Sequence, residues 1–143
     1  MSADDSPVFV DTNVLVYAFD LSAGPKHERA HDLLDQLWSN MQGSLSVQVL
    51  QEFYVTVTQK VRKPLALEAA AELVRDLSYW RLHAPVAEDV LGAIDVQRRH
   101  RLSFWDAMII WSAAQLGCAT ILSEDLAADR EYDGVLVENP FTS

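Results

Sequence analysis

The sequence is short of the features that mark secreted and membrane proteins. Cys118 is the only cysteine in 143 residues, so no intrachain disulfide can form and nothing calls for an oxidising compartment. Residues 1–5 lack the basic and apolar regions of a signal peptide, so we expect a cytoplasmic protein. The most apolar segment, residues 102–123, is interrupted by polar side chains and by Gly117. This pattern favours a buried helix followed by a buried strand over a membrane span.

Basic residues are also scarce. The chain has 11 lysines and arginines against 21 acidic residues, which gives a net charge of -10. A protein that binds nucleic acid through phosphate contacts usually presents a basic face, so composition alone does not suggest such a partner. The positive charge is concentrated in two short runs, Lys60, Arg62 and Lys63, and then Arg98, Arg99, His100 and Arg101. Basic runs of this kind are usually solvated helix ends.

What is present is the composition of an ordinary globular protein. Half of the residues are hydrophobic and 22% are charged, and the length fits one domain covering residues 1–143. Short apolar runs alternate with helical patterns, which favours βα units and a parallel sheet covered on both faces. Strands are expected at residues 7–10, 45–47, 80–84, 119–122 and 135–137, the last of them after a turn at Asp133 and Gly134. Helices are expected at residues 26–41, 47–61, 65–78, 86–100 and 103–116, with a shorter one after an N-cap at residues 12–13.

Three aspartates are candidates for a functional site because of what surrounds them. Asp106 is the only charged residue between Arg101 and Glu124. Its apolar neighbours imply a largely buried helix, where a carboxylate must be paired, hydrogen-bonded or bound to metal. Asp11 and Asp125 each follow an apolar strand, and parallel sheets bind ligands beyond the carboxyl ends of their strands.

Each of these acids also has an ordinary interpretation. Ser103 and Asp106 have the spacing of a helix capping box, and an aspartate in a first turn suits the helix dipole. Asp11 and Asp125 fit solvated turns near helix caps. A fourth acid, Glu52, lies across its expected helix from the apolar stripe, where most glutamates are simply solvated.

The segments around these four acids resemble, in order, the four motifs of PIN domains. They are residues 8–15 (VFVDTNVL), 46–53 (SVQVLQEF), 102–107 (LSFWDA) and 121–126 (ILSEDL), and the closing residues 139–141 (NPF) are familiar there too. The match spans nearly the whole chain, and its size is similar to that of the toxin half of VapBC toxin–antitoxin pairs. The resemblance implies a three-layer α/β/α PIN-like domain with a parallel sheet of four or five strands.

The resemblance also implies a site and an activity. The acids Asp11, Glu52, Asp106 and Asp125 would hold one or two divalent ions, with polar support from Asn13 and from Ser123, which stands where threonine is more usual. Oxygen ligands suit Mg²⁺ or Mn²⁺, and a metal-activated water would hydrolyse RNA to leave a 5′-phosphate and a 3′-hydroxyl. We therefore expect a metal-dependent endoribonuclease that forms a homodimer and is blocked by a VapB-like antitoxin, without membrane association. We expect its RNA backbone contacts at Arg98, Arg99 and Arg101.

Other classes of protein stay open on sequence grounds. The segment from His27 through Glu28 to His31 fits the HExxH pattern of zinc metalloproteases, although it also fits a solvated helix edge. A non-catalytic PIN-fold interaction module is a second alternative, but degenerate members lack one or more of the acids and all four are present here. Cleavage of structured DNA by a related nuclease fold is a third.

Overall fold

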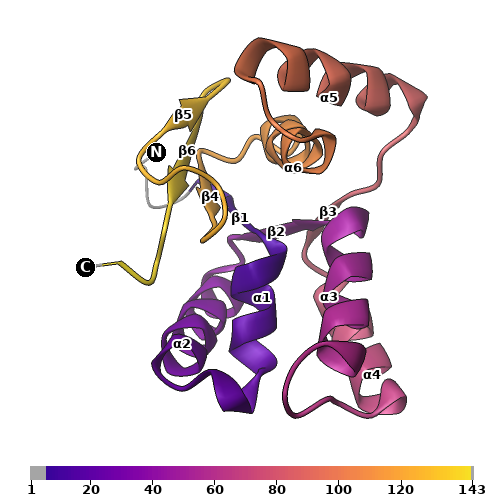
Figure 1. Cartoon of the computed structure of the whole chain (residues 1–143), viewed down its shortest axis with the longest axis vertical. Helices are drawn as coiled ribbons and strands as arrows, with labels where there is room; N and C mark the ends of the chain where they lie inside the picture. The colour runs from indigo at the N-terminus through magenta and orange to yellow at the C-terminus, as the bar shows by residue number, and fades with distance from the viewer. Residues whose placement is uncertain (1–5, 143) are drawn as a thin grey trace.

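A computed structural model describes residues 6–142 of the chain. The expectation about a signal peptide concerns residues 1–5, which lie outside this range. The described residues form a six-stranded sheet with the strand order β3-β2-β1-β4-β6-β5 (Figure 1). The parallel strands are β1 (Val8–Val10), β2 (Gly43–Ser46), β3 (Arg81–His83), β4 (Thr120–Leu122) and β6 (Val135–Glu138).

The predicted parallel sheet is therefore confirmed, with one addition. The short strand β5 (Glu131–Tyr132) was not expected, and it pairs antiparallel with β6. The turn at Asp133 and Gly134 was expected before the last strand. Both residues have positive φ, 52° and 86°, which is the backbone of a tight two-residue hairpin turn. The sequence indicated the turn but not the two-residue strand that precedes it.

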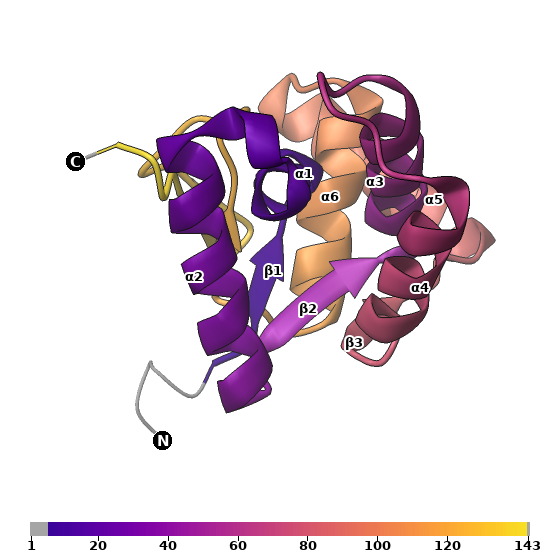
Figure 2. The same cartoon turned by 90° about the horizontal axis from the view of Figure 1, so that it is seen from below.

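Helices cover both faces of the sheet, as predicted. Figure 1 shows α1, α2, α3 and α4 on one side of the sheet and α5 and α6 on the other, and Figure 2 shows the same arrangement from below. The helices are α1 (Thr12–Phe19), α2 (Pro25–Asn40), α3 (Val47–Gln59), α4 (Leu67–Leu77), α5 (Ala87–His100) and α6 (Phe104–Gln115), with a 3₁₀ turn η2 (Leu21–Ala23). Within residues 6–142, none of these helices is long and apolar enough to cross a bilayer.

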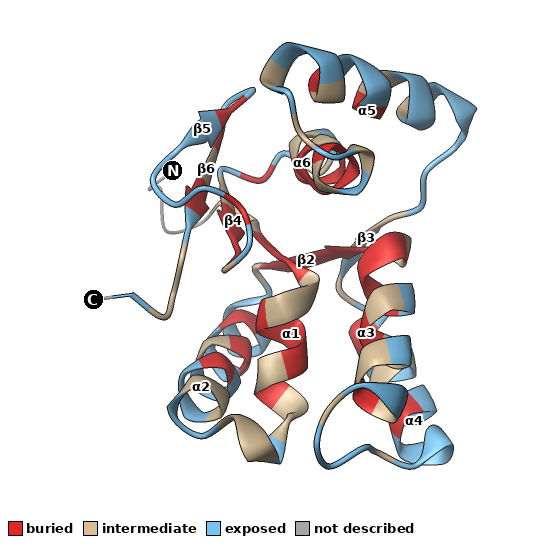
Figure 3. Ribbon diagram, viewed as in Figure 1, coloured by how far each residue is buried: buried red, intermediate tan, exposed pale blue. Residues whose placement is uncertain are grey.

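The core lies on both sides of the central strands. Phe9 and Ile121 on the neighbouring strands β1 and β4 are fully buried, and Figure 3 shows buried residues along the strands and the inward faces of the helices. Helix α6 is buried around most of its surface because it packs between the sheet and α5, so Ile109 and Ile110 are both inaccessible. This is the environment that the apolar neighbours of Asp106 predicted.

The order of the strands sets where a ligand site can form. From β1 the chain moves outward to β2 and β3, and then crosses back to place β4 on the other side of β1. The direction of winding therefore reverses between β1 and β4, and a crevice opens outside the carboxyl ends of such a strand pair. Asp11 follows β1 directly and Ser123 follows β4 directly, so the chain places polar residues at this point.

A close approach at the opposite end of the sheet gives a test of the fold. Gly43 begins β2, and a Cβ added there would overlap the indole ring of Trp80, which is also stacked at an angle on Trp38. Because an indole cannot move aside as a flexible side chain can, we expect Gly43→Ala to lower the free energy of unfolding by about 1–3 kcal/mol. Urea denaturation measures this.

The double variant Gly43→Ala/Trp80→Leu should recover part of that loss, with Trp80→Leu alone as the matched control. Additive effects of the two substitutions would show that the ring does not restrict position 43.

Candidate active site

Asp11 lies at the centre of the candidate site. It is the N-cap of α1, one residue earlier than the sequence suggested, and it is only 6% exposed. One carboxylate oxygen accepts a hydrogen bond from the Thr12 backbone N–H at 2.7 Å. The other accepts from the Ser123 hydroxyl at 2.7 Å and from the Asn13 amide at 3.3 Å. The N-cap position of α1 and the neighbouring end of β4 together hold the Asp11 carboxylate in the interior.

This environment makes the charge of Asp11 costly. The pKa of Asp11 is raised from 3.8 to about 6, chiefly by burial and to a lesser extent by the nearby carboxylates of Asp125 and Glu52, while the hydrogen bonds from Ser123 and Thr12 oppose the increase. Burial and like charges are the two effects that disfavour an ionised acid. Asp11, Glu52 and Asp125 are therefore close enough to repel one another.

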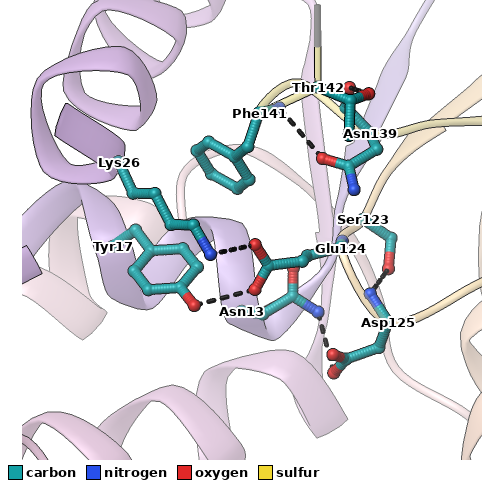
Figure 4. A network of polar contacts seen from close by, with 9 residues as sticks. All are labelled: Asn13, Tyr17, Lys26, Ser123, Glu124, Asp125, Asn139, Phe141 and Thr142. Carbon is teal, nitrogen blue, oxygen red and sulfur yellow. Dashed lines mark hydrogen bonds and ion pairs between the residues drawn. The ribbon is translucent and has the colours of Figure 1, made fainter.

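Asp125 is held by the two residues that the sequence assigned a supporting role. Ser123 donates to Asp11, and its oxygen accepts from the backbone N–H groups of Asp125 at 3.1 Å and Leu126 at 3.2 Å. Asn13 donates to the Asp125 carboxylate at 3.0 Å and accepts from the Glu124 N–H at 2.9 Å (Figure 4). Each polar side chain thus joins the end of β1 to the loop after β4.

Glu52 reaches the same region from α3. Its two carboxylate oxygens accept from the Thr12 hydroxyl at 2.6 Å and from the Gln48 amide at 3.4 Å. Thr12 belongs to the segment that carries Asp11, so this bond fixes α3 against the start of α1. Sequence reasoning described Glu52 as lying opposite the apolar stripe, and it did not identify Thr12 or Gln48 as partners.

Asp106 is positioned through its backbone. It lies in the first turn of α6, where its N–H donates to the Ser103 hydroxyl at 3.1 Å, so the expected cap is present. The Gln48 amide that approaches Glu52 also donates to the Trp105 carbonyl at 3.3 Å. This shared donor brings the start of α6 beside α3, and Asp106 is the next residue along.

Gln48 is unusual in its burial. It is 8% exposed, and within residues 6–142 its side-chain oxygen has no hydrogen-bond partner. Rotating the amide by 180° would turn that oxygen toward the Glu52 carboxylate and the Trp105 carbonyl, which are both acceptors. The observed orientation is therefore the favourable one, and it leaves a buried acceptor available to a donor.

The four acids differ in how directly the structure connects them. Asp11, Glu52 and Asp125 are joined by hydrogen bonds through Thr12 and Asn13. Asp106 is connected to them indirectly, because Gln48 bonds both to Glu52 and to the carbonyl of the adjacent Trp105. Within residues 6–142, no three acidic, histidine or cysteine side chains are close enough together to coordinate one ion. The donors still fit a hard divalent cation, because they are carboxylate oxygens whose mutual repulsion a cation would relieve.

A groove opens beside these acids, between α1 and α3. It has a volume of about 780 Å³ and contains Glu52 and Asp125 among its lining residues. Lys60 and Arg62 also line it, so one of the two basic runs of the sequence belongs to this groove. The groove therefore combines carboxylates with the positive charge that a phosphate backbone requires.

The second basic run lies at the end of α5, and its members differ. Arg99 forms two hydrogen bonds with Asp133, at 2.8 and 2.9 Å, and a third with Asp95 at 2.9 Å. The Arg99 guanidinium, with His100, lowers the pKa of Asp133 to about 2. Arg99 therefore ties α5 to the β5–β6 turn. Arg98 and Arg101 are exposed, and contact of all three arginines with RNA stays a prediction.

A further polar network supports the loop that carries Asp125. Glu124 forms an ion pair with Lys26 and accepts from the Tyr17 hydroxyl at 2.8 Å (Figure 4). Phe141 packs edge-on against the Tyr17 ring, with centroids 5.2 Å apart, and its N–H donates to the Asn139 side chain at 2.9 Å. These contacts give the closing NPF motif a structural role that the sequence did not reveal.

The two histidines of the HExxH pattern have other partners. His27 Nδ1 lies 3.0 Å from the Tyr17 carbonyl oxygen, and His31 Nδ1 lies 3.6 Å from the Asp35 carboxylate. Their rings are 5.8 Å apart and tilted by 51°. In the described part of the chain they belong to no cluster of three metal-binding side chains.

Comparison with known proteins agrees with this arrangement. The family model for the PIN domain matches residues 8–132. The chain belongs to the PIN-domain family. The match covers Asp11, Glu52, Asp106 and Asp125, and with them both strands of the switch point.

Solved structures share the PIN fold over most of their length. VapC20 of Mycobacterium tuberculosis, a toxin that cleaves the sarcin–ricin loop, matches 82% of this chain and 89% of its own, with 22% identity and a TM-score of 0.62. VapBC2 of Rickettsia felis, bound to a promoter DNA fragment, matches 92% and 97%, with 19% identity and a TM-score of 0.64. FitAB bound to the IR36 DNA fragment matches 95% and 96%, with 19% identity and a TM-score of 0.68. No curated protein is significantly similar to the sequence.

The raised pKa of Asp11 predicts how stability depends on pH. Between pH 4 and 6 the folded state binds more protons than the unfolded state, so stability falls as pH rises through this window. Above it the penalty is at most roughly 3 kcal/mol, from 1.36 kcal/mol per pKa unit. In EDTA, Asp11→Asn should therefore be more stable than wild type at pH 7.5, and this advantage should shrink toward pH 4.

Urea denaturation across this pH range measures the difference, with the exposed Asp32→Asn as the control that should match wild type throughout. A wild-type stability that does not change relative to Asp11→Asn between pH 4 and 7.5 would contradict the raised pKa.

Proposed function

We propose that this protein is a metal-dependent endoribonuclease and the toxin of a VapBC-type toxin–antitoxin pair. One observation carries the proposal: Asp11 is a buried carboxylate that two other acids face at the strand switch of a PIN domain. A buried acid with like charges beside it is unfavourable in isolation and becomes favourable once a cation is present. Acids that hold metal ions beside a groove are the arrangement by which metal-dependent enzymes hydrolyse phosphodiesters.

The chain's own residues have distinct roles in this proposal. Asp11, Glu52 and Asp125 are the ligands that the hydrogen-bond network joins, and Asp106 completes the set from α6. Bound Mg²⁺ or Mn²⁺ supplies a Lewis acid for the phosphate and lowers the pKa of the attacking water.

The surrounding side chains would orient these ligands and the substrate. Ser123 and Asn13 fix the Asp11 and Asp125 carboxylates, and Thr12 fixes that of Glu52. Lys60 and Arg62 would take the RNA backbone within the groove. A phosphate in the groove would then lie between fixed acids and exposed basic side chains.

The toxin role is supported by the fold of the neighbours. VapC20 is a toxin that cleaves the sarcin–ricin loop, VapBC2 is bound to a DNA fragment from its promoter, and FitAB is bound to the IR36 DNA fragment. We infer by analogy a cytoplasmic homodimer with a VapB-like antitoxin that covers the acids. A net charge of -10 favours a basic antitoxin segment over an acidic one.

The activity should depend on both the metal and the acids. We expect purified protein to cleave RNA with Mg²⁺ or Mn²⁺ and to stop when EDTA is added. Asp125→Asn should lower the cleavage rate by roughly 100-fold or more, since several kcal/mol of transition-state stabilisation depend on bound metal. Gel analysis of a labelled RNA, with sequencing of the ends, measures rate and product chemistry.

His31→Ala is the matched control, and we expect it to cut at the wild-type rate. Loss of activity in His31→Ala together with full activity in Asp125→Asn would favour the zinc-site alternative. Equal cleavage of single-stranded DNA would contradict the specificity for RNA.

Metal binding should distinguish the two interpretations of Asp106. If Asp106 is a ligand, wild type gains roughly 2.7 kcal/mol of stability at a hundredfold excess of Mn²⁺ over Kd, and Asp106→Asn gains much less. If it serves only in the first turn of α6, the substitution is neutral or costs up to about 1 kcal/mol and leaves the gain intact. Thermal melting in EDTA and in a Mn²⁺ series measures this, with Asp32→Asn as the control. Equal gains in wild type and Asp106→Asn would remove Asp106 from the metal site.

A further inference from the structure

Trp105 is an exposed aromatic residue immediately beside the candidate site. It is 61% exposed in the first turn of α6, next to Asp106, and its ring stands edge-on against that of Phe104, with centroids 5.0 Å apart. The adjacent Phe104 and Asp106 are half-buried and the following residues of α6 are buried, so this indole is the large apolar group that α6 presents to solvent at this end. A large exposed indole one residue from a candidate metal ligand indicates a ligand more than a packing role.

The position of the indole is fixed from its own backbone. The Trp105 carbonyl accepts from Gln48, which also donates to Glu52, and Ser103 caps the helix start. The buried Gln48 amide therefore bonds to both the Trp105 carbonyl and the Glu52 carboxylate, and it connects the two. These bonds hold the main chain at Trp105 in a constant place relative to Glu52, so the indole projects from a fixed point, which a side chain on a loose loop would not.

The charge around the site favours a nucleobase over a phosphate as the ligand of this ring. Four acidic residues and a net charge of -10 repel a polyanion, so phosphate contacts alone give little affinity here. A base stacked on an aromatic ring is bound without ionic contacts, and single-stranded RNA is commonly recognised in this way. Trp105 supplies the contact that the scarce basic residues do not.

The elements on either side define a path for the strand. Along α3, Gln48 faces the start of α6, Glu52 is one turn further, and Lys60 follows the end of the helix in the groove. At about 1.5 Å per residue, the path from Gln48 to Lys60 is roughly 18 Å. The acids thus lie between an aromatic end and a basic end.

We propose that Trp105 is a stacking platform for an unpaired base of the RNA substrate, which places the neighbouring phosphate at the acids. This inference rests on the proposed function and specifies how the substrate is held. It predicts a preference for single-stranded or loop RNA, because a base in a duplex is not available to an indole. The exposed arginine Arg101, four residues earlier in the turn before α6, is placed to contact the phosphate beyond that base.

Binding measured without cleavage tests the inference. Fluorescence anisotropy of a labelled twelve-nucleotide single-stranded RNA of mixed sequence, in EDTA, gives Kd for each full-length variant. Trp105→Ala should weaken binding by roughly 5- to 150-fold, and Trp105→Phe should retain most of the affinity, since it keeps an aromatic face. The loss should be similar at low and moderate salt, because stacking is not ionic.

Trp38→Ala is the matched control. Trp38 is also an exposed tryptophan, at 49%, but it packs on Trp80 at the other end of the sheet. Trp38→Ala should bind the single-stranded RNA with the affinity of wild type. When the same RNA is in a duplex, Trp105→Ala and wild type should bind it equally.

The outcomes separate this inference from the proposed function. Equal binding by Trp105→Ala and Trp38→Ala, with RNA cleavage by wild type intact, overturns the stacking role alone. A change of oligomeric state in Trp105→Ala by light scattering, with RNA affinity unchanged, also overturns it and assigns the ring to a protein contact. A wild-type protein that neither binds nor cleaves RNA overturns both. The Mn²⁺-induced thermal shift of Trp105→Ala should equal that of wild type, which checks that the variant is folded and its acids are intact.

Discussion

The hydrogen bond from Ser123 to Asp11 is the contact on which the site depends. It joins the ends of two neighbouring parallel strands, and the same Ser123 oxygen accepts two backbone N–H groups of the following loop. Because Asp11 also caps α1, this small cluster fixes a helix, two strands and the Asp125 loop relative to one another. A buried carboxylate needs such partners, since each one offsets part of the cost of removing its charge from water.

The remaining polar contacts join this cluster to the neighbouring elements, and each contact links one further acid or helix. Thr12 links the start of α1 to Glu52, Asn13 links it to Asp125, and Gln48 links Glu52 to the start of α6. The ion pair of Lys26 and Glu124 supports the loop from the other side. Such preorganisation is costly without a ligand, because like charges remain close together. Proteins accept this cost at functional sites and offset it by packing elsewhere, here by the buried strands and α6.

Charge shapes the rest of the molecule as much as burial does. With 21 acidic and 11 basic residues, the protein has few cations to place, and Arg99 is already engaged with Asp95 and Asp133 in holding α5 to the last hairpin. The basic residues that line the groove are Lys60 and Arg62, from the other run. The proposed nuclease would therefore have to combine few ionic contacts with contacts of another kind, and the exposed indole of Trp105 is the one that we propose.

The sequence by itself determined the alternation of strands and helices and the parallel sheet, and its resemblance to PIN domains named the four acids, whose role as metal ligands stays a prediction. These follow from local properties: apolar runs, helix caps at Ser103 and around Asp11, and motifs of a few residues each. It missed β5, because two residues carry no periodicity. It assigned RNA contact to Arg98, Arg99 and Arg101, which stays a prediction, and it did not indicate that Lys60 and Arg62 line the groove, because both basic runs look like helix ends. Only the tertiary structure decided that Thr12 bonds to a glutamate 40 residues away and Asn13 to an aspartate 112 residues away. The Asn13 pairing depends on the crossover that places β4 beside β1, and the Thr12 pairing depends on the packing of α3 against α1. No local pattern encodes the partner of a side chain that chain topology brings near.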